Sequence, residues 1–303
     1  MRARRFGTLI GLLLLCAVLW ALTPHFLTVS NLLNVVQQTS INAIVAAGMV
    51  GDLLGRPFSA MGPDKQRLSK RHGATSVTEY EKQGYIPEAM FNFLALLGWG
   101  TGSNDELFTR EELIQRFNLE GISGGNAVFN TEKLDWFNHQ HLLRLTDEEL
   151  IARLKVLGLG SWVLGTDARS SAILGLLRPR CKKLTDFAEQ LRPFFEDPDS
   201  YDPEGVKKHL SAPGSKEHIL ALKDAFAAAE WDATVLEKTL RDLADARTIK
   251  AAMLIHGTRL ALTGRMVSPG LFEMLVLVGR ENALRRLEKI ASVLPPAPSV
   301  VEG

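Results

Sequence analysis

The sequence predicts a mainly α-helical protein, and three observations support this fold class. The pattern Ser/Thr-x-x-Glu, which caps helix N-termini, occurs at Ser76, Thr109 and Thr146. Beyond residue 160, apolar residues recur at helical spacing over most of the chain. Residues 6–24 lack charged side chains and are rich in leucine, so they predict a helix long enough to cross a membrane.

The composition limits the classes of function. A chain of 303 residues is long enough for about two domains, and its net charge of +1 gives no overall basic field, so any contact with RNA must come from local patches. The two cysteines, Cys16 and Cys181, argue against a disulfide framework and a cysteine-based zinc site. His139 and His141 would point to different faces of a helix, so we expect surface or RNA-facing positions and no metal site.

A hydrophobic leader occupies the first 56 residues. Residues 1–5 are basic, and residues 6–24 would reach about 28 Å as a helix, close to the thickness of a bilayer core. The residues that follow, Thr23-Pro24-His25-Phe26, are a poor signal-peptidase site. We therefore expect a transmembrane helix with its basic start in the cytoplasm. The next apolar run, residues 41–50, is too short to be assigned as a second span.

A dense basic stretch, Met61–Val77, follows the leader. At its centre, residues 67–71 place Arg67, Lys70 and Arg71 around the hydroxyl of Ser69. Such a loop suits polyphosphate, because lysine supplies a point charge, serine and backbone N–H groups supply donors, and a nearby glycine lets the backbone approach closely. A solvated basic loop is the alternative interpretation.

Helices are predicted over most of the remaining chain. Pro87 suits a first helical turn, and Gly158–Ser161 predicts a domain boundary. Before this boundary, the expected helices are a short one from Ser76, then 88–97, Thr109 to about Phe117, 131–141 and 147–157, with a turn-rich connection over 118–130. After it, the expected helices span about 167–177, 185–195, 203–211, 216–229, 232–247, 249–256, 269–277 and 280–292. The proline-rich end, 294–303, predicts a disordered tail.

Several motifs in one order resemble the glutamyl-tRNA synthetases, a family of class I aminoacyl-tRNA synthetases. The resemblance covers about residues 61–292 and rests on the basic loop and on residues 78–94, 96–99, 108–113, 129–136, 259–264 and 268–273. It implies that Lys70, with Arg67, Ser69 and Arg71, contacts ATP, which is accompanied by Mg²⁺. Arg67 stands where the family often has lysine. The resemblance assigns no catalytic acid, base or nucleophile in this part of the chain.

The resemblance also implies two RNA-binding regions. The first, residues 57–157, holds the basic loop and a helical region that contacts the tRNA stem, where Lys133 and Arg144 can reach phosphates. The second, residues 158–293, resembles the all-helical anticodon-binding domain of bacterial-type enzymes. By its motif, Arg259, Ser268, Pro269 and Leu271 fall where anticodon bases are held in loops. Arg180 belongs to the densest basic cluster of this domain, Arg178, Arg180, Lys182 and Lys183. For Trp162 and Trp231 we expect core packing rather than base stacking.

The leader resembles a different family. Residues 1–50 are similar to the N-terminus of ribose-type sugar ABC transporter permeases, so we expect a junction between Val50 and Met61. The synthetase family also needs a first signature with two histidines in a nucleotide-binding fold, and no His-x-Gly-His pattern occurs in the sequence. We therefore expect the chain alone to be inactive in forming the glutamyl adenylate.

The predicted function is that of the tRNA-binding half of a glutamyl-tRNA synthetase. The family joins glutamate to tRNA-Glu at the expense of ATP, so the implied partners are tRNA-Glu, glutamate and ATP, and we expect a monomer. The synthetase half predicts a cytoplasmic protein, and the leader predicts membrane association if it inserts. Two alternatives stay open: a stand-alone tRNA-binding module without catalysis, and a fragment of a membrane transport permease.

Overall fold

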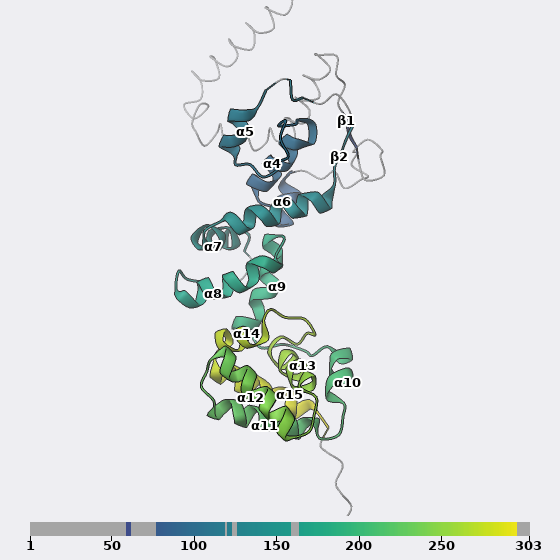
Figure 1. Cartoon of the computed structure of the whole chain (residues 1–303), viewed down its shortest axis with the longest axis vertical. Coiled ribbons are helices and arrows are strands. Elements are labelled where there is room, and N and C mark those ends of the chain that lie inside the picture. Colours follow the sequence, from purple (N-terminus) through teal and green to yellow (C-terminus); the bar gives the residue numbers. More distant parts are fainter. Residues whose placement is uncertain (1–58, 62–76, 119, 123–125, 159–163, 296–303) are drawn as a thin grey trace, which may run out of the picture. The chain divides into compact units, whose positions relative to one another are not determined.

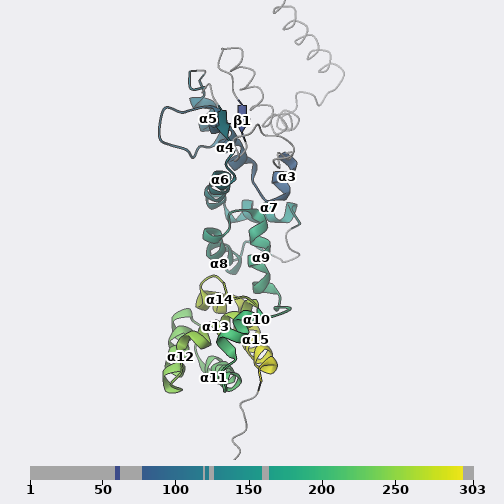
Figure 2. The same cartoon turned by 90° about the vertical axis from the view of Figure 1, so that its right-hand side faces the viewer.

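The computed structural model describes residues 59–61, 77–118, 120–122, 126–158 and 164–295, and these form two compact units (Figures 1 and 2). Unit 1 ends at His141 and unit 2 begins at Leu142. The predicted transmembrane helix at 6–24 and the basic loop with Lys70 lie outside the described residues. Within the described part of the chain, none of the helices is long and apolar enough to cross a membrane.

Unit 1 contains short helices and one pair of strands. Its elements are β1 (Ser59–Met61), α3 (Val77–Lys82), α4 (Pro87–Gly98), α5 (Arg110–Arg116), β2 (Asn126–Val128) and α6 (Thr131–Arg144), which runs past the unit boundary. The strands pair in parallel, with Ser59 opposite Asn126. The strand pair corrects our expectation that 118–130 is only a turn-rich connection. Its partner, β1, lies far away in the sequence, so local turn residues gave no sign of it.

Local signals account for the helices of unit 1. Pro87 occupies the first turn of α4, where its missing N–H leaves no hydrogen bond unmade. Thr109 and Glu112 form a complete capping box at the start of α5, with the Thr109 side chain and the Glu112 side chain each bonded to the other's backbone. Phe93, Leu134 and other apolar side chains of α4 and α6 then meet in the core of this unit.

Polar groups in the core of unit 1 are bonded to one another. Asn92 is fully buried on α4; its Nδ2 donates to the Glu106 carbonyl at 3.0 Å, and its Oδ1 accepts from the Phe108 amide at 2.9 Å. The same Oδ1 lies 3.0 Å from Nε2 of His141. His141 is therefore buried, which corrects the surface or RNA-facing position that we expected for it. A buried amide supplies the hydrogen bond that a histidine needs in an interior.

Unit 2 is entirely helical in the part described. Its helices are α7 (Asp147–Val156), α8 (Ala168–Leu177), the 3₁₀ helix η2 (Arg178–Arg180), α9 (Leu184–Phe195), α10 (Pro203–Leu210), α11 (Ser215–Ala228), α12 (Ala233–Ala246), α13 (Ala251–Thr263), α14 (Leu271–Val278) and α15 (Arg280–Val293). Helices α10 to α15 form one packed bundle (Figure 1). All eight helices predicted after residue 160 are found, and most of their ends agree within two residues.

Helix α7 falls in the same unit as the helices that follow Gly158. Arg178 explains this, because its Nη1 donates to the carbonyls of Leu142 and Leu145 at 3.0 and 2.7 Å, and its Nη2 pairs with Asp147 at 2.6 Å. The end of α6 and the start of α7 are thereby bonded to η2. The guanidinium of Arg178 is thus occupied by contacts within the protein.

Helix α13 is longer than predicted, reaching Thr263 instead of residue 256. Gly257, directly after the predicted end, lies inside the helix. A methyl group there would come within 2.7 Å of Ile219 and 3.0 Å of Leu210, which explains why this helical position is a glycine. The helix ends instead at Gly264, whose φ of +72° favours glycine. The Gly264 carbonyl accepts the amide of Asp202 at 2.8 Å, at the cap of α10. Arg259 therefore lies on a helix and not in a loop.

Candidate nucleic-acid interface

The candidate interface is built where α10 packs closely on α13. Two glycines allow this approach: a methyl group at Gly205 would lie 2.5 Å from Met266 and 3.0 Å from Leu260, and Gly257 faces Leu210. One helical turn after Gly205, His209 meets His256 of α13. Their rings stack with centroids 4.0 Å apart and planes inclined by 24°.

Arg259 lies one turn after His256 on the same helix. Its Nε donates to the hydroxyl of Ser268 at 3.0 Å, and its Nη1 lies 3.1 Å from Nδ1 of His256. Since a guanidinium only donates, Nδ1 of His256 accepts this bond and carries no proton. Ser268 in turn donates to the carbonyl of Pro269 at 2.8 Å, which fixes its hydroxyl. Within the described part of the chain, Nη2 of Arg259 donates to no group.

Positive charge dominates this site. Burial, and then the charge of Arg180, lower the pKa of Arg259. Burial lowers the pKa of His209, with Lys208 and Arg259 adding to the effect. Burial also lowers the pKa of His256, followed by the charges of His209, Arg259 and Lys208. We call Arg180, Lys208, His209, His256, Arg259 and Ser268 the Arg259 cluster. A half-buried arginine among other cations suits a ligand that carries negative charge or acceptor atoms.

The other predicted residues of this domain surround the cluster. Arg180 ends η2 and is exposed, while its charge acts on Arg259. Pro269 and Leu271 are buried, with Leu271 only 4% exposed at the start of α14. The fold thus brings Arg180, Arg259 and Ser268 together and places the two apolar residues directly after them. Trp231 packs edge-on against Phe226, as expected for core packing.

The predicted stem residues have different environments. Lys133 of α6 pairs with Glu106, and its ammonium lies 5.8 Å from the centre of the Phe137 ring. Arg144, at the end of the same helix, is exposed. Lys133 must therefore give up an ion pair to bind a phosphate, whereas Arg144 is exposed at the end of its helix. Arg67, Ser69, Lys70 and Arg71 lie outside the described residues.

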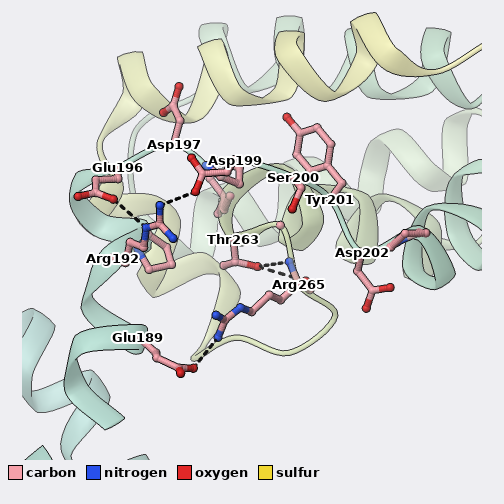
Figure 3. Close-up of a pocket in the computed structure, with 15 residues that line it drawn as sticks. Glu189, Arg192, Glu196, Asp197, Asp199, Ser200, Tyr201, Asp202, Thr263 and Arg265 are labelled. Carbon is pink, nitrogen blue, oxygen red and sulfur yellow. Dashed lines mark hydrogen bonds and ion pairs between the residues drawn. The ribbon is translucent and has the colours of Figure 1, made fainter. Parts of the chain in front are cut away.

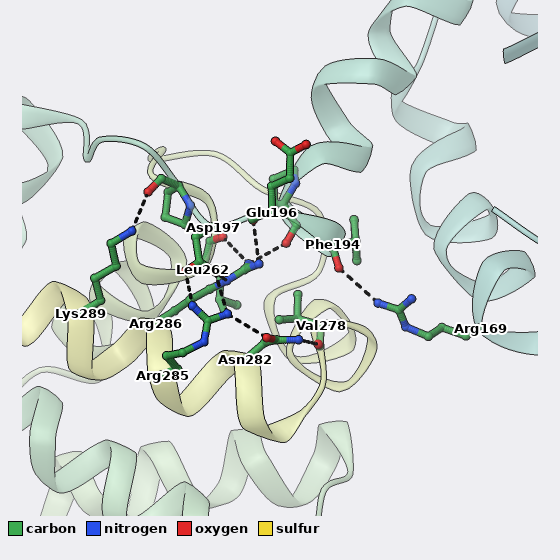
Figure 4. Close-up of polar contacts among 12 residues, drawn as sticks. Arg169, Phe194, Glu196, Asp197, Leu262, Val278, Asn282, Arg285, Arg286 and Lys289 are labelled. Carbon is green, nitrogen blue, oxygen red and sulfur yellow. Dashed lines mark hydrogen bonds and ion pairs between the residues drawn. The ribbon is translucent and has the colours of Figure 1, made fainter. Parts of the chain in front are cut away.

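A second arginine-rich site in unit 2 is internally compensated. Arg286 of α15 is only 1% exposed, and each of its three side-chain nitrogens donates at least one hydrogen bond (Figure 4). Its partners are Asp197 at 2.9 Å and the carbonyls of Pro193, Leu262 and Glu196 at 2.6, 3.0 and 2.7 Å. Arg285 pairs with the same carboxylate. Hydrogen bonds from these arginines, that from Arg285 first, lower the pKa of Asp197. We call Asp197, Arg285 and Arg286 the Arg286 cluster.

A cavity of about 300 Å³ lies beside the Arg286 cluster (Figure 3). Its arginines are already paired: Arg192 with Glu196 at 2.7 Å and with Asp199, and Arg265 with Glu189 at 3.1 Å. Acidic side chains outnumber basic ones on its wall, so it is a poor site for RNA. Among the described residues, no group of three or more His, Cys, Asp or Glu side chains is arranged to hold a metal ion.

The sequence interpretation missed the two histidines of the Arg259 cluster. His256 and Gly257 are adjacent, and Gly205 precedes His209 by one helical turn. A glycine inside a helical pattern marks a place where another backbone can approach closely. Gly205 and Gly257, each with a histidine nearby in the sequence, were therefore the available signal that two helices pack closely and bring their imidazoles together.

Comparisons with known proteins show which families the two parts of the chain resemble. Residues 138–291 match the family described as "Anticodon binding domain", and residues 39–136 match "tRNA synthetases class I (E and Q), catalytic domain". The second match begins inside the predicted leader. The Arg259 cluster lies wholly within the first match.

Curated relatives and solved structures point the same way. A glutamate–tRNA ligase 2 of Koribacter versatilis is 44% identical over 77% of this chain and 50% of its own length, and glutamate–tRNA ligase 1 of Syntrophomonas wolfei is 42% identical over 76% and 47%. The structure of a glutamate tRNA ligase from Elizabethkingia meningosepticum, in complex with its amino acid, has a TM-score of 0.70 at 27% identity, covering 78% of this chain and 51% of that one.

The chain thus spans about half the length of the curated relatives it matches. The matched half holds the end of the class I catalytic domain and the helical region in which the Arg259 cluster lies. The chain therefore belongs to the anticodon binding domain family, and its C-terminal part is of the glutamyl-tRNA synthetase type, a class I catalytic fragment followed by that domain.

Proposed function

We propose that the chain acts as the tRNA-binding half of a glutamate–tRNA ligase and recognises the anticodon of tRNA-Glu. The observation that carries this proposal is the geometry of Arg259. Ser268 and His256 fix two of its nitrogens, and Nη2 has no partner in the described part of the chain. An arginine that is held in this way can present a planar donor edge to an RNA base.

The neighbouring residues suit the same task. Arg180 adds a charge that attracts the anticodon backbone, while Pro269 and Leu271, both buried, hold in place the segment that carries Ser268. Phosphate contacts position an RNA and base contacts specify it. We assign base reading to Arg259 and Ser268, and phosphate attraction to Arg180 in the anticodon domain and to Lys133 and Arg144 in the stem-contact region.

Binding to tRNA-Glu and to a transcript with a substituted anticodon tests this proposal. We expect the full chain to bind tRNA-Glu more tightly, with affinities that fall as salt rises because phosphate contacts release counterions. Fluorescence anisotropy at two salt concentrations measures both effects. Equal affinity for the two transcripts would leave only a nonspecific basic surface.

The ATP-binding role belongs to the basic loop. We propose that Lys70, supported by Arg67, Ser69 and Arg71, contacts ATP and its Mg²⁺ in an assembled active site. Because the sequence contains no His-x-Gly-His pattern, we expect no glutamate-dependent ATP–pyrophosphate exchange by these 303 residues alone. If a separately supplied nucleotide-binding domain restored exchange, Lys70→Ala should abolish the gain. Exchange by the chain alone would contradict the proposal, because it would show that the chain is an enzyme and not only a tRNA-binding module.

The leader is a separate proposal. We propose that residues 1–50 are permease-like and that residues 6–24 insert into the membrane when they are translated. We also propose that the synthetase part is a cytoplasmic monomer. The two proposals conflict if residues 6–24 span the membrane once with their basic N-terminal side in the cytoplasm, because the RNA-binding part would then lie outside the cytoplasm. Protease accessibility of the C-terminal half in spheroplasts decides between these topologies.

A further inference from the structure

Arg259 is held by an imidazole that must be unprotonated at one defined nitrogen. Its Nη1 lies 3.1 Å from Nδ1 of His256, and a protonated Nδ1 would set two donors against each other. Ser268 holds only the Nε side of the guanidinium. The angle of the Arg259 plane therefore depends on the state of His256.

His209 restricts that state. Its ring covers His256 at 4.0 Å, and its own Nε2 is buried without a hydrogen-bond partner in the described part of the chain. A buried imidazolium N–H without an acceptor is costly. Two charged rings in a stack would also repel each other. The pair is stable when both rings are neutral.

The surroundings of the pair reinforce this condition. Lys208 and His209 on α10, Arg259 on α13 and Arg180 on η2 are the charged or titratable groups that act on the cluster, and all of them are basic. No carboxylate on α10, α11, α12, α13, α14 or α15 contributes to the pKa of His209 or His256. Among the described residues, no carboxylate compensates a proton that is added to either ring.

We propose that His209 and His256 are positioning residues that hold Arg259 for anticodon recognition only while both imidazoles are uncharged. This inference rests on the proposed function. Protonation would release Arg259 from its fixed orientation and at the same time add positive charge. Anticodon preference would then fall with decreasing pH, while nonspecific attraction to RNA would rise. A purely structural role for the pair would not separate these two effects.

The test compares affinities of the full chain for tRNA-Glu and for the anticodon-substituted transcript at pH 7.5 and pH 5.5, at constant ionic strength. Because burial lowers the pKa of both histidines from about 6.5, the change should develop below that pH. We expect the preference, the ratio of the two dissociation constants, to fall by about tenfold, as for the loss of one base-reading arginine. An unchanged preference at pH 5.5 would overturn the inference.

Variants identify the responsible groups. In His256→Asn, the amide oxygen occupies the place of Nδ1 and does not titrate, so the preference should persist at pH 5.5; His209→Phe keeps the stack and removes one proton site. His218→Asn is the matched control, because Nδ1 of His218 lies 3.3 Å from Nη1 of Arg247, away from the cluster. This control should lose its preference at low pH as the unmodified chain does. Loss of preference in His256→Asn as well would contradict the assignment.

One readout does not depend on any variant folding. The ring nitrogens of His256 can be observed by NMR at pH 7.5, and we expect the proton on Nε2 and none on Nδ1. A proton on Nδ1 would overturn the inference while leaving anticodon recognition intact. Failure of the unmodified chain to distinguish the two transcripts at pH 7.5 would instead remove the proposed function on which the inference rests.

Discussion

Two arginines on neighbouring helices of unit 2 have opposite environments. Arg286 of α15 is buried, and its guanidinium bonds one carboxylate and three carbonyls (Figure 4). Arg259 of α13 is half-buried, it bonds the Ser268 hydroxyl and the His256 imidazole, and among the described residues the charge that acts on its pKa is that of Arg180. Helices α13 and α15 pack against each other. The same residue type thus stabilises the fold in one place, and in the other it is the residue that we propose contacts RNA.

The difference follows from where acceptors lie. The last turn of α9 supplies the carbonyl of Pro193 to Arg286, and the residues after this helix supply the Glu196 carbonyl and the carboxylate of Asp197, so the buried charge is compensated by the protein. No carboxylate of the described residues acts on the pKa of Arg259. A partly buried cation that has no acidic partner lowers the stability of the fold, unless a ligand provides the acceptor. That cost is expected where binding is the purpose.

The largest expected effect is on the free energy of unfolding, when the buried arginine of the Arg286 cluster is replaced. Arg286→Met should lower the free energy of unfolding by about 3–5 kcal/mol, because it removes one partner of a buried ion pair and leaves three carbonyls without their donor. Urea denaturation followed by circular dichroism measures this. Arg285→Met, at a half-exposed position with the same carboxylate, is the control and should cost less. Equal losses of stability in the two variants would show that the burial of Arg286 does not determine its contribution.

Arg259→Ala should have a large effect on RNA recognition and a small effect on stability, in contrast to Arg286→Met. We expect anticodon discrimination to weaken by about 1–3 kcal/mol of binding free energy, with unfolding little changed, because its partners Ser268 and His256 can bond water. The measurements are the two-transcript affinities and the urea midpoint of the same sample. Arg265→Ala is a matched control on an exposed arginine paired with Glu189, and should keep the anticodon preference. A large loss of stability in Arg259→Ala would make it a second structural arginine.

The pH dependence of stability separates the two clusters further. Burial depresses the folded-state pKa of His209 and His256, so the unfolded chain binds protons first as pH falls, and stability present above about 6.5 decreases below it. The pKa of Asp197 is also depressed, by its arginines, so its contribution persists to lower pH and is lost as pH falls below about 3.8. Thermal melts from pH 7.5 to 3 should therefore show two declines. His256→Asn should reduce the first decline and leave the second.

The smallest effect is expected at Lys133. Lys133→Ala should weaken tRNA binding by less than Arg259→Ala and leave the anticodon preference unchanged, because a phosphate contact carries no sequence information. Its ion pair with Glu106 offsets part of any gain from RNA. Arg144→Ala, which changes an exposed arginine near the end of the same helix, should reduce affinity more. A change of preference in either variant would place these residues nearer the anticodon than we propose.

Much of the fold was predictable because its signals are local. The capping boxes at Thr109 and Thr146 begin α5 and α7 where expected, and apolar spacing located the helices from α8 to α15. Motif resemblance also predicted Arg259, Ser268, Pro269 and Leu271 as anticodon contacts, and the density of basic residues added Arg180. Such features need only neighbours within a few residues along the chain.

Other features depended on residues far apart in sequence. The helix predicted over 249–256 continues to Thr263, and only the close approach of Leu210 and Ile219 shows why a glycine, Gly257, lies within α13. Arg178 read as part of a basic patch, yet its donors serve Leu142, Leu145 and Asp147. His141 read as a surface residue and is buried against Asn92.

The sequence by itself determined the helical fold class, the helix ends marked by caps, and the family to which the motif of Arg259 belongs. Only the tertiary structure decided that His209 stacks on His256, that His256 accepts from Arg259, and that Arg286 rather than Arg259 is compensated by Asp197. Periodicity states which face of a helix is buried but not which helix it meets. The partner is chosen by the shapes and acceptors of segments that are distant in sequence, and the chemistry of each arginine follows from that choice.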